Sequence, residues 1–279
     1  MRLATDGELI DLGGRTYEGD IRIVGPARGI TVQNGRVRGE IRCRASGYSD
    51  VLERWNRTPD WTKAAQEAAP HDITLRDLTV EGQGDATAGV YAGPGTTDLT
   101  IRRVNFTGRT SGPSVYLSME TARNRVLGCT FSGRPGARRE VLAVDGSADN
   151  IIRNNTFNRC RYGGIYIYRN SGENGVIRHQ EPRRNLITGN RFDLAGMQIL
   201  RFTIDMKIPW GVFIGSRQGT RIRHNDLDAG YPWGSSASDL CYARENIVTD
   251  NQFRGDWLQR WVRDNDEDNV VAGNEFWNR

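Results

Sequence analysis

The chain has 279 residues, a net charge of +4 and a sequence pI near 9.0. The excess of positive charge is almost wholly Arg, which is a modest indication of an anionic partner such as a carboxylate. The four cysteines form no CxxC pair, which argues against a zinc site or a disulfide framework. Neither a secretory signal nor a transmembrane stretch is recognisable in the sequence.

The first 43 residues predict short β-strands separated by glycine turns. Segments such as GELIDLGG and GITVQNGRVRG alternate apolar and polar residues with period two, which is typical of strands. The composition changes over residues 44–70, where helix formers follow a start signal at Thr58. We therefore expect a short helical insertion near residues 50–68.

A repeated motif occupies the chain from about residue 72 to the C-terminus. The pattern Asn-x-Phe closes successive runs of alternating aliphatics, as in NIIRNNTF and NLITGNRF, with steps of 23 to 35 residues. Periods of this size indicate stacked units that bury their inner faces on one another. The matching positions are Val80, Phe106, Phe131, Phe157, Phe192, Leu227, Phe253 and Phe276. The sequence therefore predicts a single solenoid domain.

Recurring asparagines are expected to form a structural ladder. They fall in register in successive units, and stacked amide side chains can satisfy bent backbone. The members are Asn155, Asn190, Asn225, Asn251 and Asn274.

A second strand can be aligned in each unit, which predicts a second sheet. Its inward column would be Val90, Val115, Val141, Ile165, Val212 and Leu240. Its outward column would be Tyr91, Tyr116, Leu142, Tyr166, Phe213 and Cys241. Exposed aromatic side chains on a rigid sheet would suit the stacking of sugar rings, so Tyr91, Tyr116, Tyr166 and Phe213 are predicted to bind substrate.

These repeats resemble the right-handed parallel β-helix proteins of the pectate-lyase-like superfamily. The resemblance covers about residues 72–279, and the stretch GGIYIYRNSGENGVIRHQEP, from Gly163, is similar to segments of bacterial β-helix proteins. It implies an all-β fold, a single-stranded right-handed parallel β-helix that forms one domain over residues 1–279. Lyases, epimerases and glycosidases acting on polysaccharides carry such repeats, so the resemblance implies a carbohydrate-active enzyme.

Two units are longer than their neighbours, and extra residues in a solenoid loop outward from the core. We expect such insertions at 169–183 and 197–210. Their candidate functional residues are Arg169, Glu173, Arg178, His179, Arg201 and Lys207.

Paired carboxylates would support glycoside hydrolysis. In the alignment, Glu120 and Asp145 are one coil apart, and a carboxylate pair about 5 Å apart is the separation of retaining glycosidases. The oxygens of Glu120, Asp145 and Glu173 would also suit Ca²⁺ beside an acidic sugar. No other cofactor is implied by the residues.

Arginines beside these carboxylates would support β-elimination instead. Arg169, Arg217 and Arg244 would neutralise the carboxylate of a uronic acid and stabilise the enolate. Tyr168 or His179 would then take the C5 proton.

We therefore expect an enzyme that modifies an extended, acidic polysaccharide by β-elimination or a related C5 proton abstraction. The alternatives are a glycoside hydrolase using Glu120 and Asp145, and a non-catalytic tail-spike or adhesin module that binds glycan as a trimer. The protein would be secreted, periplasmic or at the cell surface, its export signal absent from this chain, and a monomer or homo-oligomer. The arginines alternate along strands rather than forming a patch, which disfavours nucleic acid. No membrane partner is expected.

Overall fold

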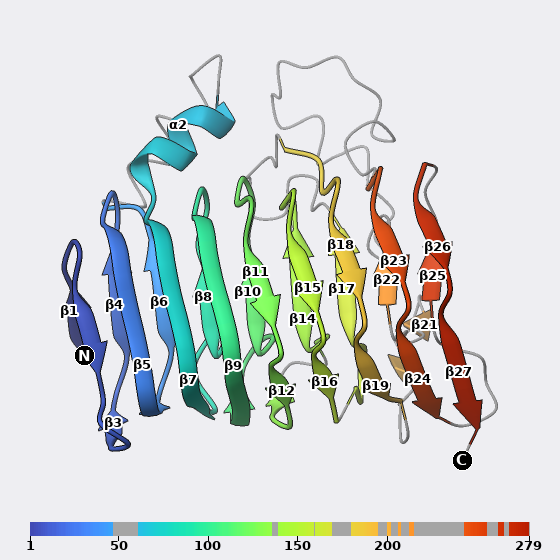
Figure 1. Ribbon diagram of the computed structural model, residues 1–279, viewed down its shortest axis with the longest axis horizontal. Coiled ribbons are helices and arrows are strands. Elements are labelled where there is room, and N and C mark those ends of the chain that lie inside the picture. Colours follow the sequence, from blue (N-terminus) through green and yellow to red (C-terminus); the bar gives the residue numbers. More distant parts are fainter. Residues whose placement is uncertain are drawn as a thin grey trace.

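The chain winds into a right-handed parallel β-helix, in which successive coils stack along one axis (Figure 1). The structure is a computed structural model that describes residues 1–46, 61–135, 139–158, 160–168, 180–194, 200–201, 206–207, 212–214, 243–255, 262–264 and 268–278. All-β architecture with one short helix was predicted from the sequence, and the structure confirms it.

Two parallel sheets form the walls of the described coil. Sheet A has nine strands: β1 (Arg2–Ala4), β4 (Ile21–Val24), β6 (Ile41–Arg44), β8 (Val90–Ala92), β10 (Val115–Leu117), β14 (Leu142–Asp145), β17 (Ile165–Tyr168), β22 (Val212–Ile214) and β25 (Val262–Asp264). Sheet B begins with β2 (Leu9–Asp11), β3 (Thr16–Glu18), β5 (Arg28–Arg38), β7 (His71–Gln83), β9 (Thr97–Thr110), β11 (Arg125–Leu127), β12 (Thr130–Phe131) and β13 (Arg134–Pro135). It continues with β15 (Ile151–Arg153), β16 (Thr156–Phe157), β18 (Leu186–Thr188), β19 (Arg191–Asp193), β23 (Ile247–Thr249), β24 (Gln252–Gly255), β26 (Val270–Ala272) and β27 (Glu275–Asn278). A separate antiparallel pair joins β20 (Leu200–Arg201) to β21 (Met206–Lys207).

The core lies between the sheets and is built from residues in register. Alternate side chains of a strand point to opposite faces, so each coil stacks its inward residues on those of the next coil. Phe106, Phe131 and Phe157 are buried and stack with ring centroids 4.8 and 4.6 Å apart. The repeated phenylalanine found in the sequence is therefore a structural rung.

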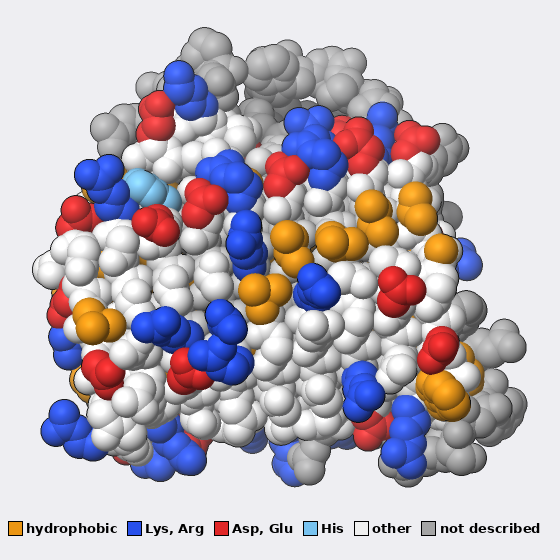
Figure 2. Space-filling model, in the orientation of Figure 1, with side chains coloured by type: hydrophobic (Ala, Val, Ile, Leu, Met, Phe, Trp, Pro, Cys, Tyr) orange, Lys and Arg blue, Asp and Glu red, His pale blue; other side chains and the backbone are white. Residues whose placement is uncertain are grey.

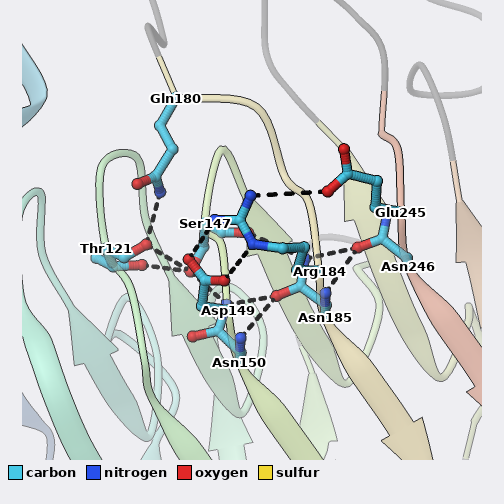
Figure 3. Close-up of polar contacts among 9 residues, drawn as sticks. All are labelled: Thr121, Ser147, Asp149, Asn150, Gln180, Arg184, Asn185, Glu245 and Asn246. Atoms are coloured by element: carbon cyan, nitrogen blue, oxygen red, sulfur yellow. Dashed lines mark hydrogen bonds and ion pairs between the residues drawn. The ribbon is translucent and has the colours of Figure 1, made fainter.

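Two ladders of asparagine side chains satisfy the backbone beside the core. Asn155 Nδ2 donates to Asn190 Oδ1 at 2.9 Å, and Asn190 Nδ2 donates in the same way to Asn251 Oδ1. Members of this ladder are Asn155, Asn190, Asn251 and Asn274, as predicted, whereas Asn225 lies outside the described residues. A second ladder, drawn in part in Figure 3, consists of Asn124, Asn150, Asn185, Asn246 and Asn269.

The corner next to the second ladder carries ion pairs between coils. Asp149, Arg184 and Glu245 all adopt positive φ there, between 53° and 58°. Arg184 binds both carboxylate oxygens of Asp149, at 2.6 and 2.8 Å, and its other Nη lies 3.7 Å from Glu245 (Figure 3). Acidic residues and arginine thus alternate from coil to coil at this corner. Their ion pairs offset part of the free-energy cost of the left-handed backbone conformation.

One coil is much longer than the sequence predicted. Phe192 stacks directly on Phe253, with ring centroids 4.7 Å apart. Because adjacent coils are themselves about 4.8 Å apart, no coil fits between these two residues. The described residues therefore leave no place for a rung between Phe192 and Phe253, where the sequence predicted one at Leu227. The prediction was wrong because Leu227 matched only a relaxed form of the motif; it lies outside the described residues.

The longest connections from sheet A to sheet B follow three of the strands of sheet A. They follow β6, β17 and β22, whereas the other described coils turn from sheet A to sheet B within a few residues. The first connection contains helix α2 (Trp61–Ala68), which lies above the strands in Figure 1. It falls within the predicted insertion. None of the described helices is long and apolar enough to span a membrane.

Candidate functional site

The outward face of sheet A carries a row of large side chains in register. Arg42 pairs with Tyr91, Tyr91 with Tyr116, and Tyr116 with Ala143, which in turn pairs with Tyr166. The sequence alignment had placed Leu142 in this row. That was wrong by one residue, because the four consecutive aliphatics in EVLAV allow either register, and Leu142 points into the core.

Tyr91 and Tyr116 of this row have both ring faces covered. Tyr91 and Tyr116 stack on each other with centroids 5.6 Å apart and planes 8° apart. The guanidinium of Arg42 lies 5.3 Å from the Tyr91 centroid, and that of Arg139 lies 6.0 Å from the Tyr116 centroid. We call these four residues the Arg-Tyr row. Since the ring faces are occupied, the row offers ring edges and guanidinium groups to a ligand rather than stacking surfaces.

Each arginine of the row is held by a buried glutamate. Arg42 Nη2 lies 2.8 Å from Glu40, and Arg139 Nη2 lies 2.7 Å from Glu140. Burial raises the pKa of Glu40 even though Arg42 opposes the shift. Burial alone would lower the pKa of Arg139, but the charge interactions with Tyr168 and Glu140 outweigh it and raise the pKa. Arg139 is therefore a fixed cation at the surface of the sheet.

Two tyrosine hydroxyls connect the row to buried carboxylates. Tyr116 donates its hydroxyl proton to Asp145 Oδ2 at 2.6 Å. Tyr168 donates to Glu140 Oε1 at 3.0 Å and accepts from Arg139 Nη2 at 2.7 Å. Asp145 and Glu140 are 0% and 1% exposed, so these contacts form in a water-poor environment where hydrogen bonds to charged groups are strong.

Small residues make room for the tyrosines. Ala143 packs with Tyr166 and Tyr168 in a cluster next to Tyr116, and a larger residue than alanine would occupy that space. Gly163 has φ of +134°, and a Cβ at this position would lie 2.5 Å from the Tyr166 ring. Tyr166 is only 2% exposed, so it supports the site rather than forming an exposed sugar-binding surface as predicted.

Register also changes the neighbours of Asp145. It pairs with Tyr168 in β17, whereas the alignment had placed it beside Arg169. The two predicted site residues Asp145 and Tyr168 therefore lie on adjacent strands. Their side chains enter the same network through Tyr116 and Arg139.

Glu120 has a different set of partners from Asp145. Its carboxylate accepts from Thr62 Oγ1 of α2 at 2.5 Å and from the backbone N–H of Gln180 at 3.0 Å, and its carbonyl accepts from Gln66 at 3.0 Å. Gln180 also reaches the carbonyl of Thr121, as Figure 3 shows. Glu120 thus links α2 to the segment that returns from the second long connection. No described contact joins it to Asp145.

Several predicted site residues lie outside the described part of the chain, or only their backbone is described. Those outside are Arg169, Glu173, Arg178, His179 and Arg217. Phe213, Arg201 and Lys207 are described by their strands alone, with Phe213 in register with Tyr166. Arg244 lies in the corner, where its carbonyl accepts from the N–H of Arg184. Among the described residues no group of three or more His, Cys, Asp or Glu could hold a metal ion, and Glu173 is not among them.

Sequence reasoning missed the charged half of the network. Arg42, Arg139, Glu40 and Glu140 were not predicted as site residues. Arg42 could have been found by extending the outward column one coil toward the N-terminus. Arg139 and Glu140 precede their strand, so strand alternation alone gives no reason to place them near Tyr168.

A protein-family model supports the fold. The family model described as the right handed beta helix region matches residues 67–201. Among solved structures, the chain is similar to the tailspike protein of E. coli bacteriophage HK620. A double mutant of that tailspike shares 16% identity with a TM-score of 0.48, over 97% of this chain and 43% of the tailspike. A single mutant in complex with pentasaccharide shares 14% identity with a TM-score of 0.45, over 99% and 52%.

The chain therefore spans about half the length of these tailspikes. A comparison with curated proteins found no match. The predicted resemblance to the pectate-lyase-like superfamily is confirmed at the level of the right-handed β-helix.

Proposed function

We propose that the protein binds an acidic polysaccharide along the outward face of sheet A and acts on it as a carbohydrate-active enzyme. The observation that carries the proposal is the Arg-Tyr row with its two buried tyrosine–carboxylate contacts. Guanidinium groups match carboxylates in shape and charge, so Arg42 and Arg139 would hold uronate carboxylates. Such a polymer is met outside the cytoplasm, and we propose that the protein works there.

C5 proton abstraction is the chemistry that this arrangement supports best. The Tyr116 side chain is half-buried, its hydroxyl already donates to buried Asp145, and the cation of Arg139 lies beside its ring. Transfer of the phenolic proton to Asp145 would leave a phenolate able to take the C5 proton of the sugar. Arg139 would stabilise the charge that develops on the carboxylate of the substrate. Tyr168, held between Arg139 and Glu140, would fix that guanidinium in place.

Hydrolysis is the first alternative reaction. The predicted pair of Glu120 and Asp145 is not supported by contacts, because Glu120 is occupied by Thr62 and Gln180. A hydrolase mechanism would instead have to combine Asp145 with Glu140, the other carboxylate in the network.

Glycan binding without catalysis is the second candidate. It is favoured by the low exposure of Glu140, Asp145 and Tyr168, which are 1%, 0% and 1% exposed, because a catalytic group has to reach the substrate. These buried groups form hydrogen bonds with one another, with Arg139 and with Tyr116. Such a network could serve only to hold the arginine side chains in place at the surface.

A panel of acidic and neutral polysaccharides separates these functions. Ultraviolet absorbance of unsaturated uronate reports elimination, and reducing ends without it report hydrolysis. Tyr116→Phe should lower the elimination rate by about 10² or more, the usual contribution of a general base. Tyr17→Phe, on sheet B, is the matched control and should not change the rate. Retained binding of the polymer with neither product would reject both enzyme mechanisms.

A further inference from the structure

A groove on the outward face of sheet B lies over four consecutive coils. The strands β16, β19, β24 and β27 pair in this order, and their outward residues form two rows. Figure 2 shows cationic, anionic and hydrophobic side chains together over the ends of β19, β24 and β27, at the lower right. Its lining includes Asn158, Arg191, Asp193, Gln252, Arg254 and Trp277.

The two arginines of the groove form no described ion pair, although Asp193 lies in register with Arg254 on the neighbouring strand. Arg191 and Arg254 are exposed, and neither forms an ion pair or a side-chain hydrogen bond with any residue that the structure describes. Elsewhere on the coil, in contrast, Arg103, Arg123 and Arg184 each bind an aspartate through two hydrogen bonds. The groove therefore keeps two guanidinium forks available for an anion.

Trp277 adds an apolar surface beside these charges. It is 55% exposed and pairs in register with Arg254 on the neighbouring strand. On the other side of Arg254 lies strand β19, where Arg191 pairs with Gln252. Arg191 and Arg254 are therefore diagonal neighbours, with Cβ atoms roughly 7–8 Å apart. The polar groups of Asn158, Asp193 and Gln252 complete the lining.

We propose that this groove is a second carbohydrate site, which binds one carboxylated sugar residue. The carboxylate would lie between Arg191 and Arg254, because the diagonal spacing lets both forks reach one anion. The indole of Trp277 would stack on the apolar face of the sugar ring. The carboxylate of Asp193 accepts hydrogen bonds from hydroxyl groups but repels a dianion, which favours a sugar acid over a phosphate.

This site is separate from the Arg-Tyr row, since it uses residues of the other sheet and none of the row. It therefore does not depend on the proposed reaction. A protein that has no activity on polysaccharides can still bind a sugar acid here, and an active enzyme can lack this second site.

The test uses an oligosaccharide of galacturonic acid and its carboxyl-reduced, neutral counterpart as probes. Tryptophan fluorescence of the full chain is followed during titration, and the Trp277→Phe variant identifies the part of the signal that comes from the groove. We expect the acidic probe to change that signal, and Arg191→Ala or Arg254→Ala to weaken binding by about tenfold or more. Arg153→Ala, an exposed arginine of sheet B outside the groove, is the matched control and should bind within about twofold of the unmodified chain.

Three results would overturn the proposal. The first is a signal that persists unchanged in Trp277→Phe. The second is equal binding by the arginine variants and the unmodified chain. The third is equal binding of the acidic and neutral probes. Circular dichroism of each variant confirms that the coil is intact, which is expected because all three side chains point outward.

Discussion

Replacement of Asn190 by alanine should destabilise the protein strongly, although the residue has no part in the proposed chemistry. Asn190 is fully buried. Its Nδ2 donates to the carbonyl of Ile152 and to Asn251 Oδ1, both at 2.9 Å. Its Oδ1 accepts from the backbone N–H and from Nδ2 of Asn155, also at 2.9 Å. The alanine variant leaves all four partner groups buried without this contact.

The expected loss follows from those four contacts. A buried hydrogen bond contributes about 1 kcal/mol, and a buried group left unsatisfied costs about 1–3 kcal/mol. The free energy of unfolding should therefore fall by about 4 kcal/mol. That is a large part of the total for a typical domain, about 5–15 kcal/mol.

Urea denaturation followed by circular dichroism measures this change. Asn158→Ala is the matched control, because Asn158 is exposed and its side chain makes one described hydrogen bond, to Ser132 Oγ at 3.0 Å. It should change stability by less than about 0.5 kcal/mol. Asn190→Asp keeps the acceptor but loses both donors, so it should be no better than alanine at neutral pH. A loss below about 1 kcal/mol in Asn190→Ala would refute the role of the ladder.

Four further predictions concern buried groups elsewhere in the coil. Cys129→Asn should be tolerated and keep the melting temperature, because Sγ of Cys129 already lies 3.5 Å from the carbonyl of Ile101, where the amide of an asparagine rung would donate. The folded state binds the Glu40 proton more tightly than the unfolded state, so the protein should lose stability as the pH rises from 4.5 through the raised pKa of Glu40. Glu40→Gln carries no such proton and should not show this loss. Urea midpoints measured between about pH 4 and 7 test the difference. Burial raises the pKa of Cys43 to about 12, so iodoacetamide should not modify it in the native protein at neutral pH, as peptide mapping can check. Glu120→Ala should speed proteolytic cleavage between β6 and β7, because Thr62 of α2 loses its side-chain contact with the coil and only the bond of Gln66 to the backbone carbonyl of residue 120 remains.

The regular part of the fold could be predicted from the sequence because its repeated residues make repeated contacts. Each Phe or Asn rung contacts the equivalent residue of the next coil, so spacing alone reveals the stack. The coil that joins Phe192 to Phe253 could not be predicted in this way. Its length depends on a connection, and connections of a solenoid carry no periodic signal.

The candidate site was predicted only in part, for a related reason. Tyr116, Asp145 and Tyr168 were found because they lie on or beside aligned strands. Arg139 was missed because it lies in a turn, and its contact with Tyr168 depends on backbone geometry that alternation does not encode. Glu120 aligns well as a strand-end carboxylate, yet α2 and Gln180 occupy it, and contacts between distant connections leave no pattern in the sequence.

The most direct test of the proposed function is proton nuclear magnetic resonance of the reaction in D₂O with an acidic polysaccharide. Elimination and epimerisation both remove the C5 proton, so the unmodified protein should cause its signal to disappear from the product, and Tyr116→Phe should retain that signal under the same conditions. Chain cleavage with the C5 proton intact, or equal loss of that proton in both proteins, would contradict the assignment of Tyr116 and Asp145 as the proton-accepting pair.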